Sequence, residues 1–410
     1  MPIRQLVFLC PFLETKERVY LVNMISPIVT IIGNGFGGVY TARALLKHGV
    51  RVRLIGTEDY FTFMPLLHEV ATGTLCDSDV RFPIRSFLTN NNKLEIISSQ
   101  AAVIDFEAKR ITLKNDSVLE YEYLVIATGA RPRFDLLQGS EHAFCLKTMN
   151  DARQIREAII RSSRSGKDHI EINVIGGGFT GLELACELDQ LLDKKIKLPS
   201  KLRMFERGGL PFAESDPKLS AYIAKRLERS GIEFHSGSVI NQVTKNSVHA
   251  NGQEFHSDIT LLTAGVQPNT DCVDKNYLDT QGNLLVSREL NIPKHPEVFA
   301  LGDIISIIGA TKPPMLAQLA VQQASLVARN ICHAVHKKPL QPYTVKVMGI
   351  LVSLGTWDAA GRVFGILISG RIAWYIWRTV YLFKTPGLSN QLRIALRWTE
   401  YLFKKRTYIP

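Results

Sequence analysis

The 410-residue sequence predicts an α/β protein with two Rossmann-type dinucleotide-binding domains and a C-terminal region of amphipathic helices. Two observations predict the domains. A G-x-G-x-x-G motif occurs at residues 33–38 and again at 176–181, and each copy follows an apolar, β-branched run. A third observation predicts the helices, because basic and bulky aromatic residues interleave from residue 341 to the C-terminus. Two dinucleotides in one chain imply electron transfer between them if both are redox cofactors.

Each glycine of the motif has a physical role. The first permits the tight strand-to-helix turn, the second lets the backbone approach a pyrophosphate, and the third lets helix and strand pack closely. The pyrophosphate then lies at the positive end of the helix. A single copy is weak support, whereas two copies that follow the predicted strands 28–32 and 170–175 are strong support.

Acidic residues after the second strand of each domain indicate ribose contacts. The predicted strand 202–205 ends at Glu206, whose carboxylate would bind ribose hydroxyls and repel a 2′-phosphate, so NADH is favoured over NADPH. The adjacent Arg207 weakens this preference. In the first domain the strand 50–55 ends at Gly56, and the acid is displaced to Glu58 or to Asp59 beside it. Glu58 is therefore either a ribose contact or part of a solvated turn.

Strand and helix signals divide the chain. A buried strand at 298–301 ends in Gly302-Asp303, and a helix is expected over 316–333. The predicted organisation is an N-terminal extension over 1–23 that is dispensable, a first domain in two parts, 24–143 and 269–339, an NADH domain over 144–268, and a membrane-anchoring region over 340–410.

The net charge of +11 is concentrated near the C-terminus. Residues 341–410 hold ten Lys and Arg against two acidic residues, which is +8 of the total. Interleaved Trp, Tyr and Phe favour an interfacial membrane region over a nucleic-acid-binding one. The apolar window 363–377 contains Arg371 and falls short of the ~20 residues that span a bilayer. A helix over 388–403 should carry an apolar face and a cationic face; these are Leu388, Leu392, Ala395, Leu396 and Leu402-Phe403, and Arg393, Arg397, Glu400 and Lys404.

Cysteine and histidine spacings carry no metal signature. The six cysteines are widely separated and none lies in a C-x-x-C pair, so neither a zinc cluster nor a disulfide framework is expected. The ten histidines show no H-E-x-x-H spacing. We therefore expect no metal.

From about residue 26 to the C-terminus the sequence resembles the type II NADH:quinone oxidoreductases, non-pumping single-subunit FAD enzymes of the pyridine nucleotide-disulfide oxidoreductase superfamily. General flavoprotein elements are the two glycine motifs, Ala127-Thr128-Gly129-Ala130 and Gly302-Asp303. More specific are residues 63–73 (FMPLLHEVATG), the A-Q-x-A-x-Q segment at 317–322 and the Trp-rich segment around Ala373-Trp374. The family often has Glu after the second Gln of that segment, where this chain has Gln323.

Together the motifs and the resemblance imply three sets of contacts. For non-covalent FAD they are Gly33, Gly35, Phe36, Gly38, Glu58, Thr128, Gly129, Asp303, Ala317 and Gln318. For NADH they are Gly176, Gly178, Thr180, Gly181, Glu183, Glu206 and Gly265. For the quinone they are Gln318 and Gln322. Glu183 and Gln318 are the candidate catalytic residues.

Three of these residues also have structural interpretations. Glu183 is expected in the first helical turn, where a carboxylate complements the helix dipole by about 0.3–1 kcal/mol, or it contacts the nicotinamide. Asp303 caps the next helix, contacts a cofactor hydroxyl, or does both. Gln318 and Gln322 share a helix face and can hydrogen-bond a quinone carbonyl, but an amide cannot release a proton.

The expected function is oxidation of NADH by hydride transfer to FAD and transfer of two electrons to a respiratory membrane quinone, without proton pumping. Alternatives are a sulfide:quinone oxidoreductase, for which Cys145 and Cys332 are the only remote candidates, another FAD-dependent NAD(P)H oxidoreductase, and a membrane-bound NADH-sensing flavoprotein. We expect peripheral attachment to an anionic membrane through the C-terminal helices, on the cytoplasmic face of a bacterial inner membrane rather than in a mitochondrion. A homodimer is possible, and no nucleic acid is expected as a partner.

Overall fold

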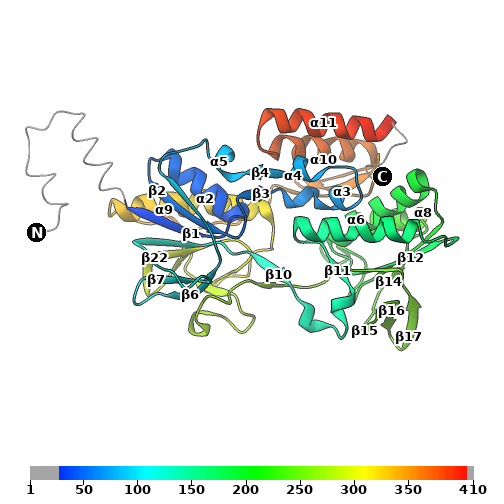
Figure 1. The fold of residues 1–410 in the computed structure, drawn as a ribbon, viewed down its shortest axis with the longest axis horizontal. Helices are drawn as coiled ribbons and strands as arrows, with labels where there is room; N and C mark the ends of the chain where they lie inside the picture. The colour runs from blue at the N-terminus through cyan, green and yellow to red at the C-terminus, as the bar shows by residue number, and fades with distance from the viewer. Residues whose placement is uncertain (1–26, 404–410) are drawn as a thin grey trace, which may run out of the picture. The chain divides into compact units, whose positions relative to one another are not determined.

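The computed structural model describes residues 27–403 (Figure 1), so the predicted extension 1–23 and Lys404 lie outside the described residues. The chain forms two compact units. Unit 1 contains the described residues up to Phe61 together with Pro83–Ala130 and Gln267–Lys346. Unit 2 contains Thr62–Phe82, Arg131–Val266 and the described residues from Val347 onward.

A six-stranded sheet organises unit 1. Its order is β21-β22-β9-β1-β2-β5, and every neighbouring pair is parallel except β21 and β22. The strands are β1 (Ile28–Ile32), β2 (Arg51–Gly56), β5 (Leu94–Ser98), β9 (Tyr123–Ile126), β21 (Asn291–Ile292) and β22 (His295–Ala300). Because β22 pairs with β9, a segment far along the chain completes the sheet that the first glycine turn begins.

Two helices of unit 1 carry predicted site residues and contact one another. They are α2 (Phe36–Lys47), which follows the first glycine turn, and α9 (Ala317–Val335), which confirms the helix expected over 316–333. The other elements of the unit are short: α5 (Ile84–Phe87), β6 (Ala101–Asp105), β7 (Arg110–Leu113), β8 (Val118–Glu120), η6 (Lys275–Tyr277), β20 (Leu284–Val286) and β23 (Ile305–Ile307).

A five-stranded parallel sheet organises unit 2, in the order β11-β18-β12-β13-β14. Its strands are β11 (Phe144–Cys145), β12 (Ile170–Ile175), β13 (Ser200–Phe205), β14 (Glu233–His235) and β18 (Ile259–Leu262). The larger helices are α6 (Met149–Ser163), α7 (Phe179–Gln190) and α8 (Pro217–Arg229). Both α6 and α8 begin at a side-chain cap: Thr148 accepts a hydrogen bond from Asp151 N, and Asp216 from Leu219 N.

The rest of unit 2 is built from small sheets and helices. An antiparallel sheet contains β15 (Ile240–Val243), β16 (Ser247–Ala250) and β17 (Gln253–His256); another contains β24 (Gly349–Ser353), β25 (Ala359–Val363) and β26 (Ile366–Ser369). The helices are α3 (Leu67–Ala71), α4 (Asp77–Val80), the π-helix η5 (Leu191–Ile196), α10 (Gly370–Lys384) and α11 (Leu388–Phe403). Four short strands, β3 (Tyr60–Thr62), β4 (Arg81–Pro83), β10 (Ala130–Pro132) and β19 (Val266–Pro268), occur where the chain passes from one unit to the other.

The helix α11 has the predicted bounds and lies beside α10 (Figure 1). Its inner face is formed by Ile394, Trp398 and Tyr401, which are buried. The leucines expected on its apolar face point to solvent: Leu392 is 59% exposed and Leu396 is 65% exposed. Within residues 27–403, no helix combines the length and apolar character needed to cross a membrane.

Candidate functional site

The first glycine turn has the sterics that a dinucleotide motif requires. A Cβ atom on Gly33, whose φ is +109°, would lie 2.2 Å from the Ala127 carbonyl oxygen. A Cβ on Gly38 would lie 1.8 Å from the Gly33 carbonyl oxygen. A Cβ on Gly35, by contrast, would meet no atom within 4 Å among the described residues. Gly33 and Gly38 are therefore needed for the turn and its packing, while Gly35 leaves open space where a pyrophosphate would approach.

A cavity of about 170 Å³ lies beside this turn in unit 1. It is lined by Ile32, Gly33, Asn34, Ile55, Gly56, Thr57, Ser99, Gln100, Ala101, Thr128, Asn269, Asp271 and Cys272. Backbone atoms at the carboxyl ends of parallel strands and a helix N-terminus are the donors that a dinucleotide needs, so the residues present fit FAD.

The displaced acid of the first domain is tied to the turn through its backbone. Asn34 Nδ2 donates to the Glu58 carbonyl oxygen at 2.8 Å. Glu58 is exposed, and the neighbouring Thr57 lines the cavity. Phe36, the first residue of α2, is buried against Phe61 in an edge-to-face contact. Phe36 therefore supports the turn from within the core.

The Thr128-Gly129 segment is held by Asn269, the residue that follows β19. Thr128 Oγ1 donates to the Asn269 carbonyl oxygen at 2.6 Å, and Asn269 N donates to the Gly129 carbonyl oxygen at 2.8 Å. Gly129 has a φ of +71°, which favours glycine. This cross-connection fixes the backbone on one side of the cavity.

The Gly302-Asp303 turn is anchored by a residue that the sequence analysis did not assign to it. Gly302 N donates to Oε1 of Gln323 at 2.7 Å, and Gln323 is buried. An amide oxygen can accept this bond at any pH, so the Gln that replaces the family's usual Glu has a clear structural use here. The capping interpretation of Asp303 was wrong: β23 follows it, and the N-cap of α9 is Leu316. Asp303 is half-buried.

The helix α9 presents the A-Q-x-A-x-Q segment in its first turns. Ala317 is its first residue, and Gln318 and Gln322 are both half-buried. Gln322 Nε2 donates to the Lys346 carbonyl oxygen at 2.8 Å. The Gln322 amide is therefore oriented by the segment that leads out of unit 1.

The second glycine turn repeats the sterics of the first. A Cβ on Gly176, whose φ is +113°, would lie 2.6 Å from Ala264 N, and a Cβ on Gly181 would lie 2.1 Å from the Gly176 carbonyl oxygen. A Cβ on Gly178 would have no neighbour within 4 Å in the described part of the chain. Thr180 and Gly265, the other predicted contacts at this turn, are exposed. In each turn, therefore, two glycines have no room for a Cβ, and one glycine, which we call the open glycine, borders empty space.

Glu206 stands at the end of β13, where a ribose-binding acid is expected. Its Oε2 accepts from Gly177 N at 2.7 Å, and its Oε1 accepts from Gly208 N at 3.0 Å. The carboxylate is therefore fixed beside the open face of the second turn and keeps lone pairs for further hydrogen bonds.

Glu183 differs from its predicted setting. The helix α7 begins at Phe179, so Glu183 is its fifth residue and lies beyond the first turn. The helix-dipole explanation was therefore wrong. Burial raises the pKa of Glu183 to about 8, although Ser353 N donates to its Oε1 at 3.1 Å. Near neutral pH Glu183 holds a proton, which a carboxylate at a helix N-terminus would not.

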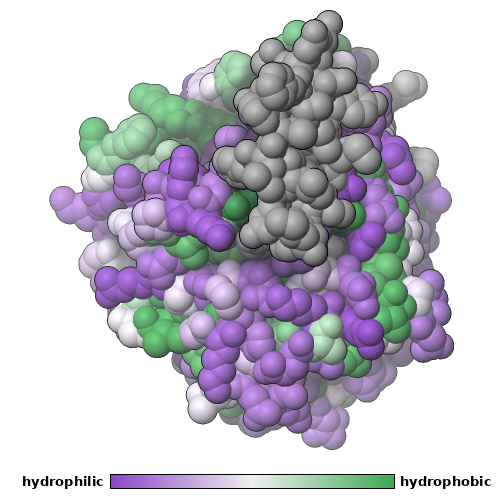
Figure 2. Space-filling model, turned by 90° about the vertical axis from the view of Figure 1, so that its left-hand side faces the viewer, coloured by the Kyte–Doolittle hydropathy of each residue, from purple (hydrophilic) through white to green (hydrophobic). Residues whose placement is uncertain are grey.

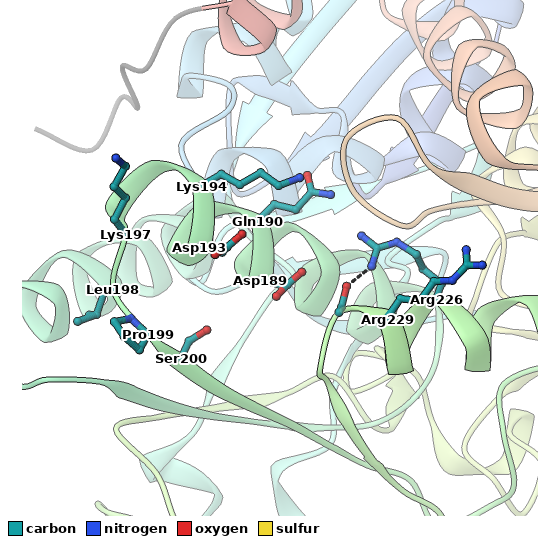
Figure 3. Close-up of a pocket in the computed structure, with 11 residues that line it drawn as sticks. Asp189, Gln190, Asp193, Lys194, Lys197, Leu198, Pro199, Ser200, Arg226 and Arg229 are labelled. Atoms are coloured by element: carbon teal, nitrogen blue, oxygen red, sulfur yellow. Dashed lines mark hydrogen bonds between the residues drawn. The ribbon is translucent and has the colours of Figure 1, made fainter.

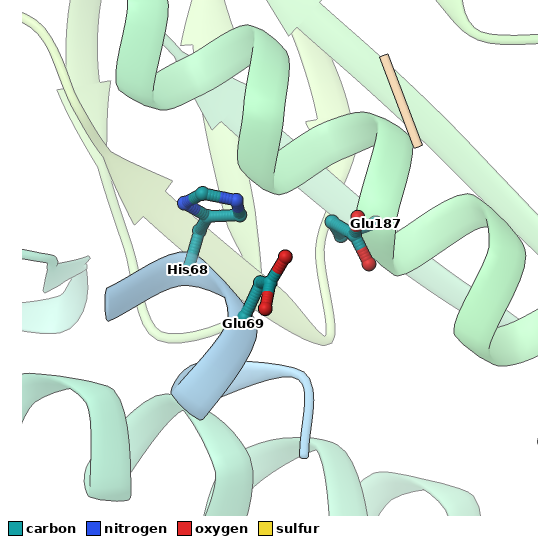
Figure 4. Close-up of side chains that lie close together, drawn as sticks. All are labelled: His68, Glu69 and Glu187. Atoms are coloured by element: carbon teal, nitrogen blue, oxygen red, sulfur yellow. The ribbon is translucent and has the colours of Figure 1, made fainter. Parts of the chain in front are cut away.

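A buried polar cluster surrounds Glu183, and the sequence analysis missed it. His68 and Glu69 on α3 face Glu187 on α7 (Figure 4). One ligand-type atom from each of these three lies within 4.8 Å of the other two. Arg378 on α10 places a positive charge beside the cluster, because its Nη2 lies 4.0 Å from Glu69 Oε1. Glu187 is 118 positions from Glu69, so no local spacing could have brought them together.

A second cavity of about 690 Å³ lies at the C-terminal ends of α7 and α8 (Figure 3). Its lining mixes acids and bases: Asp189, Gln190, Asp193, Lys194, Lys197, Leu198, Pro199, Ser200, Arg226, Arg229 and Ser230. Arg226 donates to Ser230 within it. None of the residues predicted to bind a cofactor or quinone lines this cavity, which is larger than the one beside the first turn.

Comparisons with known proteins agree with this geometry. The family model described as pyridine nucleotide-disulphide oxidoreductase matches residues 27–324. The type II NADH:quinone oxidoreductase Ndh of Mycobacterium tuberculosis is 26% identical, over 92% of this chain and 88% of that protein. The structure of NDH2 from Plasmodium falciparum in complex with NADH superposes with a TM-score of 0.86 at 19% identity, over 94% of this chain and 100% of that one.

A third similarity concerns the principal alternative. The sulfide:quinone oxidoreductase of Aquifex aeolicus superposes with a TM-score of 0.77 at 20% identity, over 93% of this chain and 96% of that one. At such identities the structural matches show the fold alone. The predicted resemblance and the α/β fold are confirmed. The chain belongs to the pyridine nucleotide-disulphide oxidoreductase family.

Proposed function

We propose that this protein is a type II NADH:quinone oxidoreductase. The observation that carries the proposal is the pair of glycine turns, each with two sterically required glycines and one open glycine, in a chain whose curated relative carries that activity. FAD, when bound, accepts a hydride from NADH and gives two electrons to a quinone. The protein supplies binding, orientation and charge.

The residues proposed for FAD surround the first turn in unit 1. The backbone N–H groups after Gly35 bind the pyrophosphate, with Gly33 and Gly38 maintaining the turn. Other contacts come from Phe36, Glu58, Thr128, Gly129, Asp303, Ala317 and Gln318. The Gln323 bond to Gly302 N keeps the Asp303 backbone in place.

The residues proposed for NADH surround the second turn in unit 2. Gly178 gives the pyrophosphate access to the backbone, and Glu206 accepts hydrogen bonds from the ribose hydroxyls. Gly176, Thr180, Gly181 and Gly265 complete the set, with Glu183 toward the nicotinamide end.

NADH is expected to be preferred over NADPH, and Glu206→Ala should narrow the preference. The Glu206 carboxylate repels a 2′-phosphate, and two backbone N–H groups hold it in place, so it cannot swing away. Loss of this repulsion should reduce the ratio of kcat/KM values about tenfold or more, equivalent to about 1.4 kcal/mol. Steady-state rates with both cofactors measure the ratio, and exposed Glu254→Ala on β17 is the control. An unchanged ratio of kcat/KM values would show that Glu206 does not contact the ribose.

Gln318→Leu is expected to slow quinone reduction and leave flavin reduction by NADH almost unchanged. The side chain keeps its size but loses the donor and acceptor that would hold a quinone carbonyl. Stopped-flow absorbance separates the two half-reactions, and we expect a loss of about tenfold in the second, as for one hydrogen bond. The exposed Gln253→Leu serves as a control. Wild-type protein that oxidises NADH but never reduces a short-chain quinone would contradict the proposed function itself.

The sulfide:quinone alternative requires a redox-active cysteine pair. Within the described residues all five cysteines are free. Burial raises the pKa of Cys145 to about 12 and also raises the pKa of Cys332. Reactive thiols have lowered pKa values, so these two candidates lack the required chemistry. Assays with and without sulfide distinguish the two enzymes.

The membrane-binding surface that we propose is the outer face of α10, α11 and the turn before β26. Its exposed side chains are Phe364, Ile366, Ile372, Tyr375, Phe383, Leu388, Leu392, Leu396 and Phe403. The view in Figure 2 shows mostly hydrophilic side chains, with hydrophobic ones gathered at the upper left and along the right-hand side. An exposed apolar patch of this kind is typical of an interfacial surface. The proposed location is the cytoplasmic face of a bacterial inner membrane.

Apolar insertion should dominate this attachment. Several cations of the C-terminal region already contact carboxylates: Arg362 with Asp216, Arg378 with Glu69, and Arg393 and Arg397 with Asp79. High salt should therefore release the protein from anionic vesicles only in part, and detergent should release it fully. The pair Leu392→Gln and Leu396→Gln should reduce vesicle flotation severalfold, whereas exposed Val118→Gln on β8 should not. If the pair instead converts a dimer to a monomer and leaves flotation unchanged, the surface is a subunit interface.

A further inference from the structure

The first and second glycine turns can be compared residue by residue, because each leaves its sheet in the same register. Strand β1 ends opposite Ile55, and β12 ends opposite Phe205. In both units the first N–H of the turn donates to the carbonyl oxygen of that opposite residue at 2.8 Å. The next residue along the second strand is Gly56 in unit 1 and Glu206 in unit 2. Gly56 therefore occupies the position at which unit 2 has its proposed ribose-binding acid.

The second residue of each turn differs in the opposite sense, since it is Asn34 in unit 1 and Gly177 in unit 2. In unit 2 a Cβ on Gly177 would lie 3.3 Å from the Glu206 side chain, whose carboxylate accepts from Gly177 N. In unit 1 a Cβ on Gly56 would lie 2.6 Å from Cγ and 3.0 Å from Oδ1 of Asn34. One polar side chain therefore fills the equivalent space in each unit. It comes from the strand in unit 2 and from the turn in unit 1.

Hydrogen bonds determine which end of the Asn34 amide remains available. Its Nδ2 donates to the Glu58 carbonyl oxygen at 2.8 Å and, over a longer distance of 3.5 Å, to the Tyr60 carbonyl oxygen. Carbonyl oxygens accept from the NH₂ group only, so the amide oxygen Oδ1 is directed away from them. Asn34 lines the cavity of about 170 Å³ beside the first turn, and no donor among the described residues reaches Oδ1. Asn34 therefore offers an acceptor to a ligand in that cavity.

Two acidic residues near the first turn are weaker candidates for this contact. Glu58 is exposed and does not line the cavity, and its carbonyl oxygen already orients Asn34. Asp271 lines the cavity, but it is exposed and belongs to the segment after β19. In dinucleotide-binding domains the ribose acceptor stands at the end of the second strand. Only the Asn34 side chain occupies that space in unit 1.

We propose that Asn34 Oδ1 accepts a hydrogen bond from a hydroxyl of the adenosine ribose of FAD, in place of the carboxylate that Gly56 cannot supply. This assignment rests on the FAD site of the proposed function. An amide does not titrate, so the contact is neutral at every pH, unlike the one made by Glu206 in unit 2. Glu58 keeps a place in the FAD site through its backbone, because its carbonyl oxygen orients Asn34.

Flavin analogues test this contact directly. The full chain, stripped of its flavin, is titrated with FAD and with analogues that lack the 2′- or the 3′-hydroxyl of the adenosine ribose, and flavin fluorescence gives each Kd. Asn34→Ala should weaken FAD binding about fivefold, as for one neutral hydrogen bond, and leave the affinity for one of the analogues unchanged. Asn115→Ala, at an exposed turn residue of unit 1, is the control. Equal losses with FAD and with both analogues would show a general disturbance of the turn and overturn the proposal.

An exchange of the two side chains provides a second test. Gly56→Asp alone should bind FAD poorly, because its Cβ would lie 2.6 Å from Asn34 Cγ. Adding Asn34→Gly reproduces the arrangement of unit 2 and should restore FAD affinity by about tenfold, as for relief of overpacking. Asn34→Asp should not bind as the wild type does, because a carboxylate cannot donate to the Glu58 carbonyl oxygen. If the double variant binds FAD no better than Gly56→Asp, the proposal is wrong.

Variants of the two acids separate the remaining outcomes. In Glu58→Ala and in Asp271→Asn the preference for FAD over an analogue should persist, because Asn34 still makes the contact. Loss of that preference in either variant, with its retention in Asn34→Ala, would assign the ribose to that acid and overturn the proposal. A wild type that shows the analogue preference but does not reduce a short-chain quinone with NADH would leave the ribose assignment standing and reject the proposed function.

Discussion

Gly38→Ala is expected to prevent stable folding of unit 1, whereas Gly35→Ala should fold and lose its flavin. The added Cβ at Gly38 would lie 1.8 Å from the Gly33 carbonyl oxygen, a backbone atom that cannot rotate away. The effect should reach or exceed the about 1–3 kcal/mol typical of overpacking. The Cβ at Gly35 would meet nothing within 4 Å in the described chain, so its only clash is with the ligand.

Two measurements separate these variants. Circular dichroism with thermal melting reports the fold, and the ratio of flavin to protein absorbance reports binding. We expect Gly35→Ala to melt as a cooperative apoprotein with flavin affinity reduced at least about tenfold. Gly35 has a φ of −81°, so the control is Gly209→Ala, at an exposed glycine of unit 2 that also lies outside the left-handed region and has room for a Cβ. Full flavin content in Gly35→Ala would show that the pyrophosphate does not bind at this turn.

Arg378→Met is expected to destabilise the protein by about 3–5 kcal/mol, the usual effect of removing one partner of a buried ion pair. Arg378 is 8% exposed, and its guanidinium lies 4.4 Å from the ring centroids of both Trp374 and Trp398. Methionine retains much of that packing but leaves Glu69 and Glu187 without a cation. The exposed Arg371→Met on the same helix should have almost no effect.

The loss of stability caused by Arg378→Met should grow as pH rises. Arg378 lowers the pKa values of Glu69, Glu187 and His68, so its removal raises all three and the folded variant binds more protons than wild type. When the folded state binds more protons than the unfolded state, stability falls with rising pH. In wild type this fall already runs from the ordinary carboxyl pKa of 4.5 to about 8 for Glu187. Thermal melts at several pH values should therefore diverge between variant and wild type, and parallel curves would exclude charge loss as the cause.

Local sequence patterns predicted the parts of this fold that depend on neighbouring residues. The strand at 170–175, the helix α11 and the two glycine turns follow from periodicity and from glycine sterics, which act within a few residues. The start of α7 was misjudged because nothing caps it by a side chain; its N-cap is Gly178. That error also gave Glu183 the wrong electrostatic setting.

The buried cluster could not have been predicted in the same way. It joins α3, α7, α10 and α11, and a pair such as Glu69 and Trp398 is separated by 329 positions. From sequence alone, a charged residue in an apolar helix is predicted to lie at the surface. Arg378 and Glu69 are nevertheless buried together. Only the tertiary fold shows that their charges oppose one another.

The two faces of α11 also determine how the helix responds to a pulling force. On its inner face Arg393 donates to Asp79 at 2.7 Å, Trp398 donates to Glu69, and the Tyr401 carbonyl accepts from Lys195 Nζ at 2.8 Å. Each contact works at one axial position only, so sliding the helix by a single turn would break all three and leave the buried Asp79 and Glu69 side chains without these partners. A force applied to the exposed leucines of α11 is therefore transmitted to the rest of unit 2, because the helix cannot slide along its own axis.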